Sequence, residues 1–255
     1  ASDGFTANWR EPDEVAKLEP RITPEILGGM YDHGNAAVDS KKLTEAFAKA
    51  ARSTIREGNV TGLEGSGGTI DRVILEDDEI SCGQVVMAMG PWSRKAESWL
   101  GVYIPVDPLK GEILRLELVG ERIQYDISGG GASIYPKLDG LNWCGTTEDW
   151  KGFDRGLSED VAKEIRRRLG RIFPLLAESK LAKHTACLRP VTPDWLPVLG
   201  RAPGWENVYM ATGAGKKGIL LAPGIGKSVA DLITTGESGL SIQAYAPDRF
   251  ATQLD

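Results

Sequence analysis

The chain has 255 residues and a net charge of -6, and both numbers narrow its class. At roughly 150 residues per domain, the length fits one large domain or two closely associated ones. Nucleic-acid binders carry a basic excess, so 36 acidic against 30 basic residues argue against that class. The sequence contains no apolar run near the roughly 18 residues of a membrane span. It has no visible secretory signal, and its three cysteines and two histidines lack zinc-ligand spacing. We therefore expect a cytoplasmic protein in a reduced compartment, without a metal site.

The first part of the chain is predicted to combine helices with short strands. Its opening 24 residues are expected to form loops and a short helix at 13–18, and Asp39 is expected to cap a helix that runs to about residue 56. Strands are predicted at 60–63, 69–75 and 80–82. The unbroken apolar run at 85–89 is typical of a fully buried parallel strand, and a helix is expected to follow at 91–100.

The second part is predicted to be richer in strands. Strands are expected within 103–119 and at 133–136, 141–145, 184–189 and 208–211. Ser158 is expected to cap an amphipathic helix at 159–173, with Arg166 to Arg168 on its solvated face, and a last helix is predicted from residue 221 or 223 to 234. This order indicates an α/β fold with an α+β insertion, in which an antiparallel block interrupts a layered sheet.

A glycine-rich loop follows the strand predicted at 208–211. Glycines let the backbone approach a planar or anionic group, and the helix that follows presents unbonded N–H groups. The spacing Gly213-x-Gly215-x-x-Gly218 fits the dinucleotide pattern GxGxxG, but only one helix and the chain end follow it. The acidic residue expected about 20 positions later on a second strand is therefore missing. A tight strand–helix turn is the alternative interpretation.

Two other segments have the character of binding sites. Arg189 lies between a predicted strand and a proline-rich turn, where its guanidinium can bind a carboxylate with two hydrogen bonds. An internal salt bridge to Asp194 is the alternative for Arg189. The segment VVMAMGPWS at 85–93 ends a buried strand with glycine, the place at which open sheets present their backbone to ligands. A plain strand–turn–helix is the alternative there.

Together and in this order, these segments resemble the FAD-dependent D-amino-acid oxidase superfamily, most closely the branch of glycine oxidase, sarcosine oxidase and D-amino-acid dehydrogenase. The resemblance rests on motifs along nearly the whole chain: VVMAMGPWS at 85–93, KGEIL at 110–114, IYPK at 134–137, GTTE at 145–148, GFD at 152–154, LRPVTPD at 188–194, the glycine-rich segment 211–226 and APDRF at 246–250. The family's N-terminal βαβ unit, which carries its glycine fingerprint, has no counterpart before Asp39. We therefore expect an oligomer, or a partner chain that supplies this unit, because sheet edges and apolar faces would otherwise be exposed.

The resemblance implies two domains and a cofactor. A remnant of the FAD-binding layered sheet would comprise 31–102 and 191–255, and an antiparallel-sheet substrate domain would comprise 1–30 and 103–190. The residues implied to contact FAD are Val60, Ala88, Gly90, Trp92, Gly213, Ala214, Gly215, Lys217, Gly218 and Ile219. The helix from Pro223 would point its N-terminus at the N1–C2 carbonyl region of the flavin, where negative charge gathers on reduction.

The resemblance also implies substrate-binding residues. Arg189 would bind the substrate carboxylate, and Ser133 and Tyr135 would lie on the hairpin that lines the substrate cavity. Because side chains along a strand alternate between its faces, only one of these two is expected to point inward. Lys216 corresponds to a basic residue near the active site of the glycine oxidase branch, with plain solvent exposure as the alternative. Cys187 has the spacing of the cysteine that links covalently to flavin in sarcosine oxidases, although we favour a buried, inert thiol.

The reaction that the resemblance implies is oxidation of the C–N bond of a small amine or amino acid. A hydride would pass to the flavin, and water would hydrolyse the resulting imine. An FAD-dependent glycerol-phosphate-type dehydrogenase fits less well, because a phosphate substrate would require more clustered cations. The second hypothesis is a truncated, non-catalytic member of the family, or a subunit that needs a partner with the missing nucleotide-binding unit.

Overall fold

The computed structural model describes residues 7–34 and 36–253, and the chain divides into two compact units. Unit 1 comprises Ala1–Arg52, Gly111–Asp149 and Arg155–Cys187, and unit 2 comprises Ser53–Lys110, Trp150–Asp154 and Leu188–Asp255. The sequence analysis placed domain boundaries after residues 30, 102 and 190 instead. That the units correspond to a substrate domain and an FAD-binding domain stays a prediction, and residues 1–6 of the predicted substrate domain lie outside the described residues.

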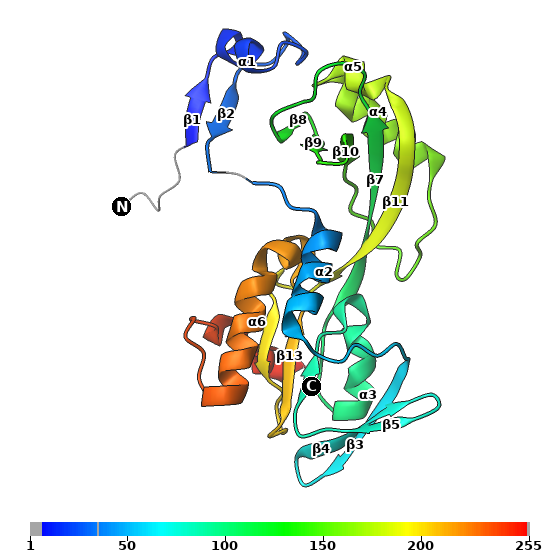
Figure 1. The fold of residues 1–255 in the computed structure, drawn as a ribbon, viewed down its shortest axis with the longest axis vertical. Coiled ribbons are helices and arrows are strands. Elements are labelled where there is room, and N and C mark those ends of the chain that lie inside the picture. Colours follow the sequence, from blue (N-terminus) through cyan, green and yellow to red (C-terminus); the bar gives the residue numbers. More distant parts are fainter. Residues whose placement is uncertain (1–6, 35, 254–255) are drawn as a thin grey trace. The chain divides into compact units, whose positions relative to one another are not determined.

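A five-stranded sheet forms the framework of unit 1. Its strand order is β11-β7-β10-β9-β8, with β7 at Asp107–Glu117, β8 at Ile127–Gly129, β9 at Ala132–Pro136, β10 at Leu141–Gly145 and β11 at Lys180–Val191. Strand β10 pairs antiparallel with β7 and β9, and β9 pairs antiparallel with β8. The long neighbouring strands β7 and β11 begin in one unit and continue into the other (Figure 1).

The helices α4 (Glu159–Gly170) and α5 (Pro174–Ala177) cover one face of this sheet. The core between them contains Leu114, Leu116, Ile134 and Cys144 from the strands and Ile165, Leu169, Phe173 and Leu176 from the helical region. Ser158 caps α4 as predicted, since its hydroxyl accepts a hydrogen bond from the backbone N–H of Val161 at 3.4 Å. The helix ends at Gly170 rather than at residue 173, because the proline at 174 disfavours a helical conformation in Phe173 before it.

The N-terminal part of unit 1 contains a strand pair that the sequence did not predict. Strand β1 (Ala7–Arg10) pairs antiparallel with β2 (Gly29–Asp32), and α1 (Pro12–Leu18) lies between them in the chain. The short helix α1 is confirmed. Helix α2 (Ser40–Ala51) begins after Asp39, whose side chain accepts hydrogen bonds from two backbone N–H groups as predicted. It ends before residue 56 because Arg52 adopts a left-handed conformation with φ 51°.

Unit 2 contains two three-stranded sheets. One has the order β12-β13-β6, formed by Val198–Arg201, Val208–Thr212 and Val85–Met87. The other is the antiparallel meander β3-β4-β5, formed by Val60–Ser66, Thr69–Leu75 and Glu79–Ser81. The predicted parallel strand is confirmed, since β6 pairs parallel with β13. The prediction that this strand is fully buried is wrong, because Val86 is 43% exposed and only one face of β6 is covered.

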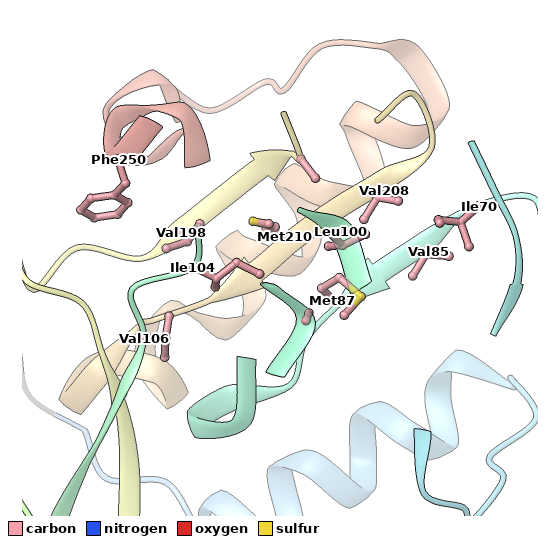
Figure 2. Packing of buried hydrophobic residues seen from close by; sticks show 12 residues of the cluster. Ile70, Val85, Met87, Leu100, Ile104, Val106, Val198, Val208, Met210 and Phe250 are labelled. Carbon is pink, nitrogen blue, oxygen red and sulfur yellow. The ribbon is translucent and has the colours of Figure 1, made fainter. Parts of the chain in front are cut away.

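The side chains of β6 and β13 pack into the larger core of unit 2. Val85, Met87, Val208 and Met210 meet Leu100, Ile104 and Val106 there (Figure 2). The predicted helix at 91–100 forms as a 3-10 helix, η1 (Gly90–Ala96), followed by the short α3 (Glu97–Leu100). A smaller core contains Leu199, Tyr209 and Val229, the last from helix α6 (Gly218–Thr235).

Helix α6 begins earlier than predicted. The prediction placed the start of this helix at residue 221 or 223. The helix instead starts at Gly218, directly after the 3-10 turn η2 (Gly215–Lys217), and Pro223 lies inside it. The C-terminal segment continues as two more 3-10 helices, η3 (Gln243–Tyr245) and η4 (Pro247–Gln253).

Candidate functional site

Two glycine segments meet in unit 2 at the carboxyl ends of parallel strands. Gly90 follows β6 and Gly213 follows β13, and the register of the two strands places their carboxyl ends at the same edge of the sheet. Ser93 Oγ lies 2.6 Å from Thr212 Oγ1, and both hydroxyls are within hydrogen-bond distance of the Gly90 carbonyl oxygen, at 2.7 and 3.2 Å. These buried hydroxyls join the two segments. Ser93 ends the VVMAMGPWS motif and Thr212 lies in the glycine-rich segment, but neither side chain was expected to have a role.

The backbone at this edge has the conformation that favours glycine. Gly90 has φ +53°, and no described heavy atom lies within 4 Å of the position that a Cβ would occupy. Gly213 has φ +73°, and a Cβ there would meet Thr192 Cγ2 at 2.8 Å. The open space at Gly90 lets a ligand approach the backbone closely, so this edge fits a bound nucleotide cofactor.

Helix α6 presents its N-terminus next to the same loop. It has 18 residues, and within the described part of the chain Lys217 supplies no side-chain cap to its first turn. Unbonded N–H groups and the helix dipole give such an end a partial positive charge. Because the helix begins at Gly218, residues 213–217 lead directly into it, and the predicted start at residue 221 or 223 is wrong.

Arg189 lies on β11 close to the glycine loop. Val191, two residues further along the strand, forms an isolated antiparallel bridge with Ala214. Asp194, the alternative partner considered for Arg189, is bound by Arg249, whose Nε and Nη2 lie 2.8 and 3.3 Å from its two carboxylate oxygens. Burial alone would raise the pKa of Asp194. The hydrogen bonds from Arg249 and from the backbone of Leu196 outweigh this effect, so the pKa of Asp194 lies below its usual value.

The other residues of unit 2 that were predicted to bind FAD or substrate lie partly beside Gly90, partly in the loop before α6 and partly in the meander. Ala88 and Trp92 lie beside Gly90 in the chain, and the Trp92 ring stacks on Phe153 with centroids 5.9 Å apart. Lys216 is exposed, and its Nζ lies 5.3 Å from the centre of the Trp195 ring. Val60 begins β3 in the separate meander and is 38% exposed. The structure thus collects the predicted residues of 88–92 and 213–219 at one edge and places Val60 in another sheet.

Ser133 and Tyr135 are half-buried, and both lie on the face of the unit 1 sheet that is turned away from α4 and α5. The expectation that only one of them points inward is wrong, because residues two apart on a strand share a face, and it is Ile134 between them that enters the core. Ser133 Oγ accepts a hydrogen bond from Ser128 Oγ at 2.9 Å. Cys187 is also contrary to expectation, since its side chain is exposed rather than buried.

A row of cations and aromatic rings crosses the same face of the sheet. Trp143 is the direct cross-strand neighbour of both Arg115 and Tyr135. The Arg115 guanidinium lies 4.1 Å from the Trp143 ring centre, and Lys137 Nζ lies 5.5 Å from the same ring and 5.8 Å from Tyr135. The alternation along each strand was visible in the sequence, but the row depends on the pairing register and was missed.

His184, to which the sequence analysis assigned no role, lies beside a buried carboxylate. Its Nε2 is 2.8 Å from Glu112 Oε2, and the backbone N–H of Ser158 donates to the same oxygen at 3.1 Å. This contact links β11, β7 and the start of α4. Within residues 7–34 and 36–253, no group of three side chains has the arrangement of a metal site.

The comparisons with known proteins settle the family. The family model of FAD-dependent oxidoreductases matches residues 1–232. The chain belongs to this family. A glycine oxidase of Pseudomonas aeruginosa is 29% identical over 240 residues, which cover 92% of this chain and 66% of the relative. A D-amino acid dehydrogenase of Paramagnetospirillum magneticum is 30% identical and is covered over 60% of its length.

Two solved structures of oxidoreductases share the fold. The crystal structure of glycine oxidase from Geobacillus kaustophilus superposes with a TM-score of 0.90 at 26% identity, covering 96% of this chain and 68% of that chain. An L-proline dehydrogenase from P. horikoshii has a TM-score of 0.89 at 24% identity. These matches confirm the predicted family, the mixed α/β fold and FAD as the family's cofactor. The chain spans 64% of the length of a glycine oxidase from Pseudomonas putida. No helix in the part of the chain that the structure describes is long and apolar enough to cross a membrane.

Proposed function

We propose that this family member oxidises the C–N bond of a small amine or amino acid with FAD. The observation that carries the proposal is the meeting of three elements within unit 2. The segments of Gly90 and Gly213 adjoin at one sheet edge, and the strand of Arg189 bridges the glycine loop through Val191 and Ala214. This nearness supports the proposal that FAD binds at the two glycine segments and that Arg189 binds the substrate carboxylate beside it. The glycine oxidases and D-amino acid dehydrogenases among the relatives support the same reaction class.

The residues proposed to hold FAD are Ala88, Gly90, Trp92 and residues 213–219, with Val60 as a further contact from the meander. Open space at Gly90 and the left-handed backbone at Gly213 fit close approach of a planar group. The N–H groups at the start of α6 favour negative charge beside them. When bound, FAD supplies the two-electron oxidation of the substrate.

The protein itself binds and orients the substrate. Arg189 would hold the carboxylate with two parallel hydrogen bonds, which fixes the α carbon and its C–H bond in one orientation. Ser133 and Tyr135 are proposed as further substrate contacts and have half-buried side chains with hydroxyl groups on one face of β9. Lys216 would add a positive charge near the substrate, held over the ring of Trp195. The exposed thiol of Cys187 is accessible for a covalent link to flavin, which denaturation would reveal if colour stayed with the polypeptide.

The proposal is tested by the visible absorption spectrum of the chain, before and after FAD is added and free FAD is removed. We expect the two visible bands of oxidised flavin to stay with the protein, and small amino acids or sarcosine to bleach them without oxygen. A chain that stays colourless would instead favour the non-catalytic member, or the subunit that requires a partner.

Variants of Arg189 then test the carboxylate contact. Losing a charge-assisted bidentate pair costs about 2–4 kcal/mol, so Arg189→Met should raise KM for amino acids about 30- to 1000-fold, and Arg189→Lys should restore only part of it. Arg201→Met, which removes an exposed arginine of β12, serves as the matched control. Unchanged KM in Arg189→Met would contradict the assignment.

A further inference from the structure

Unit 1 contains a cavity that the proposed cofactor residues do not line. Its volume is ≈ 720 Å³, within the range of about 300–1,000 Å³ typical of small-molecule sites. Tyr135, Lys137 and Trp143, on the sheet face turned away from α4 and α5, form one wall. Residues of 30–33, 36–39 and 122–128 form the others. Tyr135 connects the cavity to the proposed substrate-binding strand, which also carries Ser133.

Aromatic rings line much of this cavity. The Tyr31 ring meets His33 and Tyr125 edge to face, with centroids 4.5 and 5.9 Å apart. The rings of Tyr135 and Trp143 already hold a positive charge of the chain itself, the ammonium group of Lys137. Aromatic faces attract cations through their quadrupole, so these rings suit a positively charged group.

The charges of the lining also favour a cation. The lining contains two basic residues, Arg122 and Lys137, and four aspartates. With His33 neutral, its net charge is therefore -2. The aspartates are Asp32, Asp39, Asp126 and Asp139. Asp32, Asp39 and Asp139 accept hydrogen bonds from nearby backbone N–H groups, so part of their charge is locally compensated.

Asp126 differs from the other three carboxylates. Among the described residues it has no hydrogen bond and no ion pair within 4.0 Å, although it lines the cavity next to Tyr125. Burial raises the pKa of Asp126, and the opposing effect of Lys137 does not cancel it. The Asp126 carboxylate therefore lacks a close partner of opposite charge.

We propose that this cavity binds a primary ammonium or guanidinium group, with Asp126 as its ion-pair partner and Tyr125 as its aromatic wall. The inference goes beyond the proposed function and names the class of ligand for this cavity of unit 1: an organic amine or guanidine, such as a diamine or the side chain of a basic amino acid. An anionic ligand is disfavoured because it would compete for Lys137 with the carboxylates of Asp39 and Asp126, on which the charge of Lys137 already acts.

Calorimetric titration of the full chain tests the cavity without any need for turnover. The probes are 1,4-diaminobutane, butyrate and 1-butanol, which share a four-carbon chain and differ in charge. We expect the diamine to bind most tightly. Because hydrogen bonds to charged groups are strong, Asp126→Asn should weaken its binding about 10- to 100-fold. Tyr125→Leu should weaken it about 3- to 5-fold, whereas Tyr125→Phe, which keeps the ring, should leave it unchanged.

The control Asp77→Asn removes an exposed carboxylate in unit 2 and should leave diamine binding unchanged. Preferential binding of butyrate, abolished by Lys137→Met, would overturn the proposal in favour of an anion site. Binding of none of the probes, or equal binding by Asp126→Asn, would also overturn it.

A second measurement separates this inference from the proposed function. Oxidation of small amino acids by the FAD-loaded protein is followed in the wild type and in Asp126→Asn, and the diamine titration is repeated on the same samples. Diamine binding that depends on Asp126 supports the cavity, whether or not any amino acid is oxidised. Oxidation of amino acids by a protein that binds the diamine no more tightly than Asp126→Asn leaves the proposed function standing and overturns the cavity proposal.

Discussion

Asn207 connects the start of β13 to the neighbouring meander in unit 2 through both atoms of its amide. Its Oδ1 accepts from the backbone N–H of Ile70 at 2.9 Å, and its Nδ2 donates to the carbonyls of Ile70 and Gly83 at 2.7 and 2.9 Å. The side chain is buried, so the carboxylate of Asn207→Asp would face two carbonyl oxygens with no donor between them. We expect this variant to lose about 2–4 kcal/mol of unfolding free energy.

Urea denaturation followed by circular dichroism measures that loss. The control is Asn8→Asp on β1, an exposed position at which the same change should stay within about 0.5 kcal/mol. Equal stability of the two variants would show that the Asn207 amide does not hold the sheets together.

The cysteines differ in reactivity because they differ in burial. Burial in the unit 1 core raises the pKa of the Cys144 thiol to about 12, from a usual value of 9.0. Its thiolate therefore forms in the unfolded chain at lower pH than in the folded chain. The stability that this thiol contributes is fully present below pH 9.0 and is lost as pH rises towards about 12.

Alkylation at pH 8 followed by mass spectrometry checks the prediction. We expect the exposed Cys187 to be modified in the folded protein and Cys144 only after unfolding. Cys144→Ala should also remove part of the loss of stability between pH 9 and about 12. Labelling of both cysteines at similar rates would be incompatible with this core.

The glycine segment before α6 and the helix itself respond differently to an added methyl group. At Gly213 the left-handed backbone and the contact with Thr192 make alanine unfavourable, so Gly213→Ala should cost about 1–3 kcal/mol. Gly226 is exposed within α6, and no described atom lies within 4 Å of its missing Cβ. Gly226→Ala should therefore stabilise the chain by about 0.5–1 kcal/mol.

Thermal unfolding of the two variants gives opposite shifts in Tm if the segment has this conformation. The comparison also bears on cofactor binding, because Gly213→Ala should weaken FAD retention. A stabilising Gly213→Ala would show that the turn before α6 has a different backbone from the one described.

The elements show what local sequence can and cannot predict. Signals within a few residues were sufficient for α1, β4, β10 and the caps of α2 and α4, because capping and alternation act over one or two turns. The pair β1–β2 was missed because two four-residue strands are stabilised mainly by each other. The early start of α6 was missed because the glycine-rich segment before it was interpreted as a loop, whereas it leads through a 3-10 turn directly into the helix.

In the candidate site too, local sequence predicted the individual segments but not how they come together. Motif spacing identified the segments of Gly90, Gly213 and Arg189, since each is continuous in the chain. Their proximity required the parallel pairing of β6 with β13 and the bridge between Val191 and Ala214. The cation–aromatic row and the cavity beside it depend on the register of three strands, which no single segment encodes.

At the scale of the whole molecule, each unit has its own hydrophobic core, but the strands β7 and β11 run through both units. The core of unit 1 and the larger core of unit 2 have no buried residue in common. The chain nevertheless passes between the units repeatedly, and the boundaries at Lys110 and Cys187 fall inside β7 and β11. Neither unit can unfold completely while both strands keep all their hydrogen bonds.

This continuity predicts that damage to one core lowers the stability of both units. Leu169→Ala in unit 1 and Met210→Ala in unit 2 each remove a fully buried side chain and should each cost about 2–5 kcal/mol. Because β7 and β11 belong to both units, we expect hydrogen exchange to accelerate in the strands and helices of both units in either variant. Mass spectrometry of peptic peptides after timed exchange resolves the two units, with Asn8→Asp as the surface control. Faster exchange confined to the unit that carries the substitution would mean that the units unfold independently despite the strands they share.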